Sequence, residues 1–232
     1  MKKRLLFSIV IVSLLIFSLP VSVLAEQGDD IVILYENDVH CEIEGYSVLS
    51  AMRNELEQKY EHVGIVTSGD FLQGGSLGSI SRGEYVVRLM NLVGYDAIAL
   101  GNHEFDYGLD RLYELADMLN TKPVCANFKK IGAGEVFEPY SIVSYGDVKI
   151  AYIGVTTPTT PDTTSFPTQF VDENKNPIYT FSKDDIADVV QENIDKALAE
   201  GADFVIALSH LGDEEYQYNA AQMVSDTVGL DV

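Results

Sequence analysis

The sequence has little cysteine and little basic charge. Only two of its 232 residues are cysteines, Cys41 and Cys125, which excludes a dense disulfide scaffold and allows at most one disulfide. Lysine and arginine number 15 against 36 aspartates and glutamates, a formal net charge of −21. Such a chain lacks the clustered cations that binding to a nucleic-acid polymer requires. A small anionic substrate would also be repelled, unless local cations reverse the sign of the charge at its site.

Long apolar runs are scarce as well, and the one that is present lies at the N-terminus. Residues 1–25 have a basic head, an apolar stretch and small residues at Val23 and Ala25. This pattern is typical of a secretory signal peptide and predicts cleavage before Glu26 and export across the cytoplasmic membrane. The alternative is an uncleaved anchor, although the run is short for a span of about 20 apolar residues. No later segment could cross a bilayer, so residues 26–232 are expected to form one exported domain without a transmembrane segment.

Strand-like and helix-like segments alternate along the rest of the chain. Repeated units of this kind predict an α/β core. A hairpin that turns at Gly146 and Asp147 adds antiparallel pairing, so the expected class is α+β in part. The sequence contains no internal repeat. The expected strands are 31–37, 62–68, 96–100, 123–128 and 202–210, and the expected helices are 46–60, 83–94, 109–120, 183–201 and 214–228.

Two of the expected helices have a marked apolar face, whereas one connecting segment has no regular pattern. The segment 156–170 is rich in threonine and proline, which predicts an irregular surface loop. The apolar positions of the two helices recur at the helical period, and we expect them to face the core. They are Val48, Leu49, Met52 and Leu56 in the first helix, and Ile186, Val189, Val190, Ile194, Ala197 and Leu198 in the helix 183–201.

Polar side chains gather directly after four of the expected strands. Three of the four histidines of the chain lie in these clusters. Taken singly, each cluster has an ordinary explanation: Asp70 could cap a helix, and His210 could be a hydrogen-bonded core histidine. Ligands of open α/β sheets bind beyond the carboxyl ends of the strands, so the shared location favours a functional site. The clusters contain Asn37, Asp38 and His40; Ser68 and Asp70; Asn102, His103 and Asp106; and Ser209 and His210.

These residue types suit a pair of metal ions. Carboxylate oxygen and neutral imidazole nitrogen are the usual ligands of zinc, manganese and iron. Two cations roughly 3.5–4 Å apart need a bridging anion, which Asp70 could supply. Asp38 and His40 are two apart on a segment expected to be extended, and would therefore point to the same side, toward one ion. Asn102 and His210 could serve the other ion.

Four motifs in this order, NDVH, GD, GNHEFDYG and SHLG, resemble those of the calcineurin-like metallophosphatases, and within them the secreted 5′-nucleotidase family. The stretch 81–108 is similar to that family almost throughout, and the resemblance runs from about Ile31 to the end of the chain. It implies a two-layered core of mixed β-sheets flanked by helices, with a dinuclear metal site.

The resemblance also implies a role for each residue of the site. The metal ligands would be Asp38 and His40 on the first ion, Asn102 and His210 on the second, and Asp70 between the two. His103 would then contact the phosphate of the substrate, and Asp106 would orient His103. Glu104 is expected to be structural.

The activity implied by the resemblance is release of phosphate from a nucleotide. A hydroxide bound to two divalent ions, zinc, manganese or similar, would attack phosphorus in line, and a cationic His103 would stabilise the developing charge. The cations would also make the site of an acidic protein attractive to a nucleotide. Because the same core serves other family members, a 2′,3′-cyclic-nucleotide phosphodiesterase and a nucleotide-sugar hydrolase are alternatives.

The chain departs from the family pattern at two places. Cys41 stands where the family usually has glycine, and is expected to be a size substitute rather than a redox centre. Family members also carry a later Gly-His-x-His motif and a C-terminal domain that grips the nucleoside, and neither follows His210. The expectation is therefore a C-terminally incomplete metallophosphatase domain over 26–232, without the nucleoside-binding domain. A catalytically feeble metal-binding fragment is the alternative.

Overall fold

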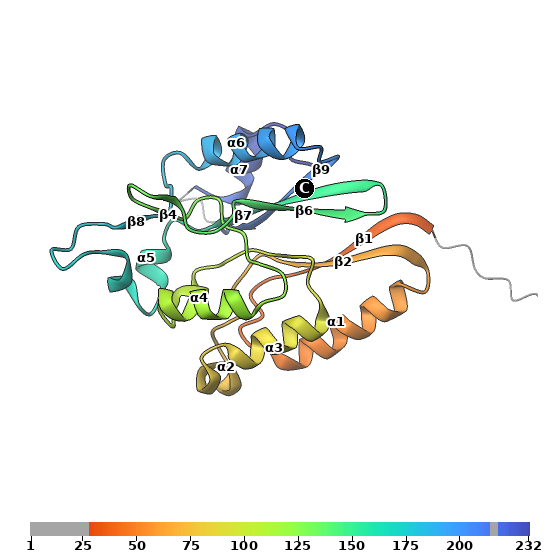
Figure 1. Ribbon diagram of the computed structural model, residues 1–232, viewed down its shortest axis with the longest axis horizontal. Coiled ribbons are helices and arrows are strands. Elements are labelled where there is room, and N and C mark those ends of the chain that lie inside the picture. Colours follow the sequence, from red (N-terminus) through yellow and green to blue (C-terminus); the bar gives the residue numbers. More distant parts are fainter. Residues whose placement is uncertain (1–27, 214–217) are drawn as a thin grey trace, which may run out of the picture.

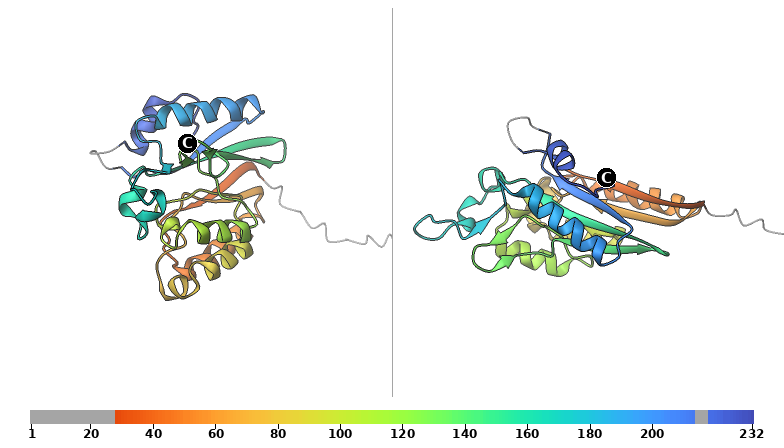
Figure 2. Two further views of the ribbon diagram at one scale, coloured as in Figure 1. Left: turned by 60° about the vertical axis from the view of Figure 1, so that its left-hand side comes forward. Right: turned by 90° about the horizontal axis from the view of Figure 1, so that it is seen from above.

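The computed structural model describes residues 28–213 and 218–232, and the predicted signal peptide, residues 1–25, lies outside these ranges. Figure 1 shows two sheets in the middle of the molecule with helices on the outer side of each, and Figure 2 shows the same layers from two other directions. The expected α/β class with mixed sheets is confirmed. Among the described residues, no helix has both the length and the apolar character needed to span a membrane.

The first sheet is parallel and contains β1 (Gly28–Glu36), β2 (Tyr60–Thr67) and the short β3 (Ala97–Ile98). Its outer face is covered by α1 (Ile43–Leu56), α2 (Ser76–Ser81), α3 (Glu84–Val93) and α4 (Leu109–Met118). Parallel strands need a crossover between them, and the helices that follow β1 and β2 supply it, as the alternating pattern predicts. The carboxyl ends of the three strands consequently meet at one edge of the sheet.

Helix α1 buries only part of the apolar face that the sequence pattern predicts. Tyr46 is buried in this helix, and Leu49 packs against the same core one turn later. Val48 and Met52, which were expected to face the core, are 58% and 47% exposed. Tyr46 and Leu49 are three apart and share one face, whereas Val48 and Met52 are four apart and share another. The core therefore covers only part of the apolar surface of α1.

The second sheet consists of β6 (Tyr140–Tyr145), β7 (Val148–Thr156) and β9 (Phe204–His210). The hairpin predicted at Gly146 and Asp147 is confirmed, because Tyr145 pairs with Val148 directly across that two-residue turn. Strand β9 pairs with β7 in parallel, which makes the sheet mixed. Its last residue, His210, therefore ends at the same edge as Thr156, the last residue of β7.

Helices α6 (Ile186–Ala199) and α7 (Ala220–Asp226) cover the outer face of this second sheet. Helix α6 buries the predicted apolar face except for Leu198, which is 42% exposed. Helix α7 is shorter than the predicted helix 214–228, and the first four residues of that prediction lie outside the described residues. Asn219 ends the preceding loop and caps α7 through its side chain, so the helix starts one residue later.

The expected strand at 123–128 is wrong. Only Val124 forms a bridge, and the segment crosses from one sheet to the other. Three successive amides of the segment donate to three different neighbours, so no ladder with a single strand can form. The amides of Val124, Cys125 and Ala126 donate to the carbonyls of Ile98, Glu138 and Gly154, respectively.

The predicted irregular loop 156–170 is partly ordered and partly buried. It contains the short helix α5 (Thr160–Thr163) and the 3-10 turn η2 (Pro167–Phe170). Thr160 and Phe170 are buried, so the expectation of a surface loop is wrong for these residues. Nearby lies a small third sheet of β4 (Lys129–Lys130), β5 (Gly134–Glu135) and β8 (Tyr179–Thr180).

Candidate metal centre

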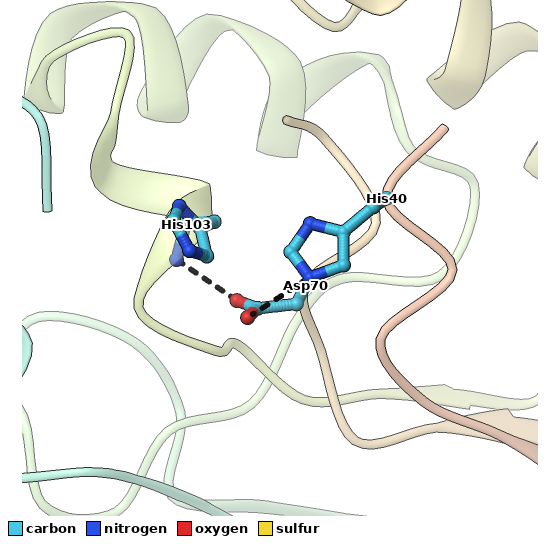
Figure 3. Close-up of side chains that lie close together, drawn as sticks. All are labelled: His40, Asp70 and His103. Carbon is cyan, nitrogen blue, oxygen red and sulfur yellow. Dashed lines mark hydrogen bonds and ion pairs between the residues drawn. The ribbon is translucent and has the colours of Figure 1, made fainter. Parts of the chain in front are cut away.

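The polar clusters that follow the strands meet at one edge of the two sheets. The carboxylate of Asp70 lies at the centre, with its Oδ2 3.2 Å from Nε2 of His210 and 3.8 Å from Nε2 of His40. Oδ1 of Asp38 is also 3.8 Å from Nε2 of His40. Figure 3 shows His40 and His103 converging on Asp70 from different segments of the chain. The structure thus gathers residues of both sheets around one carboxylate.

The backbone that carries these side chains is not extended, so the geometric reason expected for Asp38 and His40 is wrong. The φ angles of Asp38, His40 and Asp70 are 53°, 43° and 59°. Few residues other than glycine adopt this left-handed region. The loops are joined by backbone hydrogen bonds, from the amide of Asp38 to the carbonyl of Gly69 at 3.1 Å and from His40 to Asp70 at 2.9 Å. The loop after β1 is therefore coiled against the loop after β2, and this coil turns both side chains toward Asp70.

Glu104, expected to be structural, holds the loop that carries Asp70. The residue is 1% exposed, and burial together with the nearby charge of Asp70 raises its pKa. Its two carboxylate oxygens accept four backbone hydrogen bonds of 2.7–3.0 Å, from the amides of Asp70, Phe71, Leu72 and Gly101. Four amides that would otherwise be buried without a partner are satisfied by one side chain. The loops after β2 and β3 are thereby fixed relative to each other.

Asn102 lies between two residues that the same network fixes. A side chain at the preceding Gly101 would collide with the carboxylate of Asp70, so this close approach requires glycine. The following His103 donates its backbone amide to Oδ1 of Asp70 at 2.8 Å. Asn102 itself is buried, at 9% exposure. Its neutral amide oxygen is a ligand type suited to a divalent cation beside that carboxylate.

Two histidines of the site are oriented by backbone carbonyls. Nδ1 of His40 is 3.2 Å from the carbonyl of Gln73, and Nδ1 of His210 is 3.1 Å from the carbonyl of Ser68. A carbonyl can only accept, so each Nδ1 carries a proton and each Nε2 faces Asp70. Proteins prepare neutral histidines as metal ligands in this way.

The potential ligand atoms fall into two groups that share Asp70. His40, Asp70 and His103 form one group, and Asp38, Asp70 and His210 form the other; within each group the ligand atoms lie within 4.8 Å of one another. The resemblance implies Asp38 and His40 on one ion, and Oδ1 of Asp38 is also 3.8 Å from Nε2 of His40. Carboxylate oxygens and imidazole nitrogens around a shared carboxylate fit divalent cations such as zinc or manganese.

The electrostatics of the site favour positive charge beside Asp70. Burial alone would lower the pKa of His210, but the hydrogen bond to Asp70 and the charge of that group raise it to about 9. Burial would likewise raise the pKa of Asp70, yet its interactions with His210 and His103 hold it below the ordinary value. A divalent cation would supply the same positive charge in place of the proton.

His103 and Asp106 form a hydrogen-bonded pair next to the two groups. Nδ1 of His103 is 2.7 Å from Oδ2 of Asp106, and the ring of His103 lies edge-on to that of His40 with centroids 5.1 Å apart. Burial would lower the pKa of His103, but the hydrogen bond to Asp106 and the charge of Asp70 raise it. The pair is therefore predisposed to carry a proton on the imidazole.

Two residues that no sequence motif indicated hold the other oxygen of Asp106. The hydroxyl of Thr164 donates to Oδ1 of Asp106 at 2.7 Å, and the amide of Ser165 donates to the same atom at 2.6 Å. Both belong to the segment that was predicted to be an irregular surface loop. A run of threonines carries no local signal of such a contact, because the partner is 58 residues away.

Two cavities adjoin the site. One of about 390 Å³ is lined by Asp38 and His210 among others. A second of about 770 Å³ is lined by Asp106, Tyr113 and Phe166 among others. Both volumes fall in the range of small-molecule binding sites, so there is room for a substrate on either flank of the ligand groups.

Cys41, which follows His40, is a free and buried thiol. It donates weak hydrogen bonds to the carbonyls of Phe71 and Leu72, at 3.3 and 3.1 Å. Burial raises its pKa to about 11, so it is a thiol rather than a thiolate at neutral pH. Cys125 is also free and buried, and the disulfide that the sequence allowed is not formed.

Comparison with known proteins identifies the family. The family model of the calcineurin-like phosphoesterases matches residues 31–231. The chain is 33% identical to the snake venom 5′-nucleotidase of Gloydius brevicauda, over 81% of this chain and 34% of that protein. It is 30% identical to the 5′-nucleotidase of Bos taurus, over 80% and 34%. The chain thus spans about a third of the length of the curated relatives that it matches.

Solved structures share the fold. The calcineurin-like phosphoesterase YfkN from Bacillus subtilis aligns with a TM-score of 0.71 and 26% identity, covering 87% of this chain and 70% of that one. The 5′-nucleotidase precursor from Thermus thermophilus aligns with a TM-score of 0.66 and 27% identity, covering 78% and 37%. The resemblance that the four motifs carry is confirmed at the level of the family. The chain belongs to the calcineurin-like phosphoesterase family.

Proposed function

We propose that the chain is a metal-dependent phosphoesterase of the 5′-nucleotidase type, which releases phosphate from nucleotides. The observation that carries the proposal is the carboxylate of Asp70, which two groups of potential ligand atoms share, next to the pair of His103 and Asp106. A shared carboxylate is what two nearby cations need to offset their repulsion. The nucleotide as substrate class is supported by the names of the curated relatives, which are 5′-nucleotidases.

The protein would hold two divalent cations, zinc, manganese or similar, on residues of both sheets. When bound, such ions lower the pKa of a coordinated water and withdraw charge from the phosphate oxygens. The ligands proposed for them are Asp38, His40, Asp70, Asn102 and His210. Glu104 keeps Asp70 in place through its backbone, and the carbonyls that accept from Nδ1 keep the two ligand histidines turned toward it.

His103 would act on the phosphate rather than on a metal ion. Its Nδ1 is engaged by Asp106 at 2.7 Å, which leaves Nε2 for the substrate. Its raised pKa favours the imidazolium. A cation at this position stabilises the negative charge that develops on the transferred phosphoryl group. Asp106 would keep the ring in this orientation and stabilise its charge.

The bound cations would also explain how an acidic protein attracts an anionic substrate. The formal net charge of the chain is −21, which repels a nucleotide phosphate over most of the surface. Two divalent cations at the edge of the sheets would reverse the sign locally. Activity is therefore expected to depend on metal for binding as well as for chemistry.

Export is the second part of the proposal. The basic head, apolar stretch and small residues of 1–25 support a signal peptide with cleavage before Glu26. Residues 26–232 would then be the metallophosphatase domain, acting in the periplasm, at the cell surface or outside the cell.

The test is a comparison of substrates on the purified chain. The protein is stripped with a chelator, reloaded with Mn²⁺ or Zn²⁺, and assayed with 5′-AMP, 2′,3′-cyclic AMP and UDP-glucose. We expect metal-dependent phosphate release from 5′-AMP at the highest kcat/KM of the three. A preference for either of the other two would replace the nucleotidase by the phosphodiesterase or the nucleotide-sugar hydrolase. Metal retention without turnover of any of them would contradict the proposed activity and support a metal-binding role.

A further inference from the structure

The carboxylate of Asp106 is fully engaged by hydrogen-bond donors. Its Oδ2 accepts from Nδ1 of His103 at 2.7 Å. Its Oδ1 accepts from the hydroxyl of Thr164 at 2.7 Å and from the amide of Ser165 at 2.6 Å. The side chain of Asp106 is only 3% exposed, so water does not compete for these positions. Three donors on two oxygens hold the carboxylate of Asp106 in one orientation. The plane of this carboxylate in turn fixes the orientation of the imidazole of His103.

The segment that supplies two of these donors is anchored independently of Asp106. The amide of Thr164 donates to the carbonyl of Thr160 at 3.0 Å, and the hydroxyl of Thr160, a fully buried residue, donates to the carbonyl of Thr157 at 2.6 Å. The hydroxyl of Thr164 is thus presented from a fixed backbone rather than from a loose loop.

A second anchor joins this segment directly to the 3-10 turn that carries His103, η1 (His103–Phe105). Nε2 of Gln169 donates to the carbonyl of Phe105 at 3.0 Å. The ring of Phe170 packs against that of Phe105 with centroids 5.6 Å apart. The segment is therefore joined to this turn at Phe105, and Thr164 contacts the next residue, Asp106.

We propose that Thr164 is a positioning residue of the reaction, acting through Asp106 on His103. The inference rests on the proposed function, in which Nε2 of His103 meets the phosphate. The hydroxyl proton of Thr164 holds Oδ1 of Asp106, which keeps Oδ2 aligned with Nδ1 of His103. The imidazole then keeps its proton on Nδ1 and presents Nε2 in one direction. Thr164 is the one side chain among the described residues that donates to Oδ1, since the other donor is a backbone amide.

Two substitutions separate positioning from packing. Thr164→Val keeps the shape of the side chain and removes the hydroxyl, whereas Thr164→Ser keeps the hydroxyl and removes a methyl group. The amide of Ser165 still satisfies Oδ1 in both variants, so neither leaves a buried acceptor without a donor. Thr163→Val is the matched control, because Thr163 is exposed and its hydroxyl donates to the carbonyl of Thr159.

The experiment measures kcat, KM and metal content of the metal-loaded full chain with 5′-AMP. We expect Thr164→Val to lower kcat by about ten- to a hundredfold, with KM and metal content within twofold of the parent, because small misplacements of a catalytic group have effects of this size. Thr164→Ser and Thr163→Val should stay within about threefold of the parent kcat. An unchanged kcat in Thr164→Val, or an equal loss in Thr164→Val and Thr164→Ser, would overturn the proposal.

A second readout does not depend on turnover. The imidazole nitrogen signals of His103, recorded by NMR, report which nitrogen carries the proton and how fast it exchanges with water. We expect a protected proton on Nδ1 in the parent and in Thr164→Ser, and faster exchange in Thr164→Val. The same protection in all three would overturn the positioning role. A parent chain that shows the protected proton but hydrolyses no nucleotide would remove the proposed function while leaving this arrangement standing.

Discussion

The two large sheets end at the same site but contribute to it in different ways. The β1–β2–β3 sheet supplies most of the proposed ligands from loops whose backbone is left-handed at Asp38, His40 and Asp70. The β6–β7–β9 sheet supplies His210 from the last position of a regular strand, in register with Thr156. One half therefore places ligands by coiled loops and the other by strand register.

Because of this difference, the ligand residues of the two sheets are held in place by different contacts. His210 needs its strand and one carbonyl contact, from Ser68. The loops of the first sheet need Glu104, which accepts four amides from two of them. Strained conformations persist only where the surroundings over-determine them, and a buried carboxylate with four donors does so. Changes in the first half should thus disturb several ligands, and changes at His210 only one.

The largest effect is expected at the carboxylate that both halves share. Asp70→Asn removes the charge between the two proposed ions, so metal binding should fall from about two ions per chain to none and hydrolysis by more than about a thousandfold. His210→Ala should lose at most one ion, and hydrolysis should fall less than in Asp70→Asn. The measurement is metal analysis of dialysed protein together with phosphate release. Asp117→Asn, an exposed position, is the control and should match the parent. Equal metal content in Asp70→Asn and the parent would contradict the shared ligand.

The next effect separates the phosphate contact from the metal ligands. His103→Ala should retain both ions and lose turnover by about 10²–10⁴-fold, the usual contribution of a positioned acid or charge stabiliser. The ring of His103 lies in one of the two potential ligand groups, so metal analysis of this variant is decisive. Loss of an ion together with turnover would make His103 a ligand.

A smaller effect is expected at Glu104, which holds the loops after β2 and β3. In Glu104→Gln, an NH₂ group replaces an oxygen that accepts from two amides, so two buried donors lose their partner. At about 1–3 kcal/mol for each, the free energy of unfolding should fall by about 2–6 kcal/mol, and metal affinity should weaken. Urea unfolding measures the first quantity and metal titration the second. Glu114→Gln, an exposed partner of Arg111, should change the stability by less than about 1 kcal/mol. Similar values for both variants would show that the loops do not depend on Glu104.

The smallest effect concerns pH and lies at the end of β1. Both carboxylate oxygens of Glu36 are buried, and burial raises its pKa to about 7 from an ordinary 4.5. Because the folded state holds this proton more tightly, the group costs stability as pH rises from about 4.5 to 7, by up to about 3 kcal/mol. Glu36→Gln should therefore flatten the pH dependence of unfolding in metal-free protein between pH 5 and 8 relative to the parent. The same slope in both proteins would contradict this assignment.

The sequence could predict those parts of the fold that local patterns determine. Alternating strands and helices, the hairpin at Gly146 and the face of α6 follow from periodicity and turn chemistry. The segment 123–128 did not follow, because an apolar run cannot show that its successive amides have different partners. The predicted face of α1 was wrong for Val48 and Met52 but not for Leu49, because the pattern shows which residues are apolar but not how much of the helix surface the sheet covers.

The sequence likewise predicted one part of the candidate site and not another. The positions of the motifs after strands predicted that these residues would meet at one edge of the sheets, and the structure places them there. The approach of Asp38 and His40 to Asp70 depends on left-handed loops, and the support that Thr164 gives to Asp106 depends on a contact across 58 residues. Neither was predicted, because a positive φ is uncommon outside glycine and most aspartates do not adopt it, so the residue type alone does not indicate it.

We expect Asp70 to lie between two divalent cations. Crystals of the full chain grown with Mn²⁺, and diffraction recorded at the manganese absorption edge, test it most directly. We expect two anomalous peaks about 3.5–4 Å apart. Each peak should contact a carboxylate oxygen of Asp70, whether the two peaks contact different oxygens or the same one. One peak, no peak, or peaks away from Asp70 would contradict it.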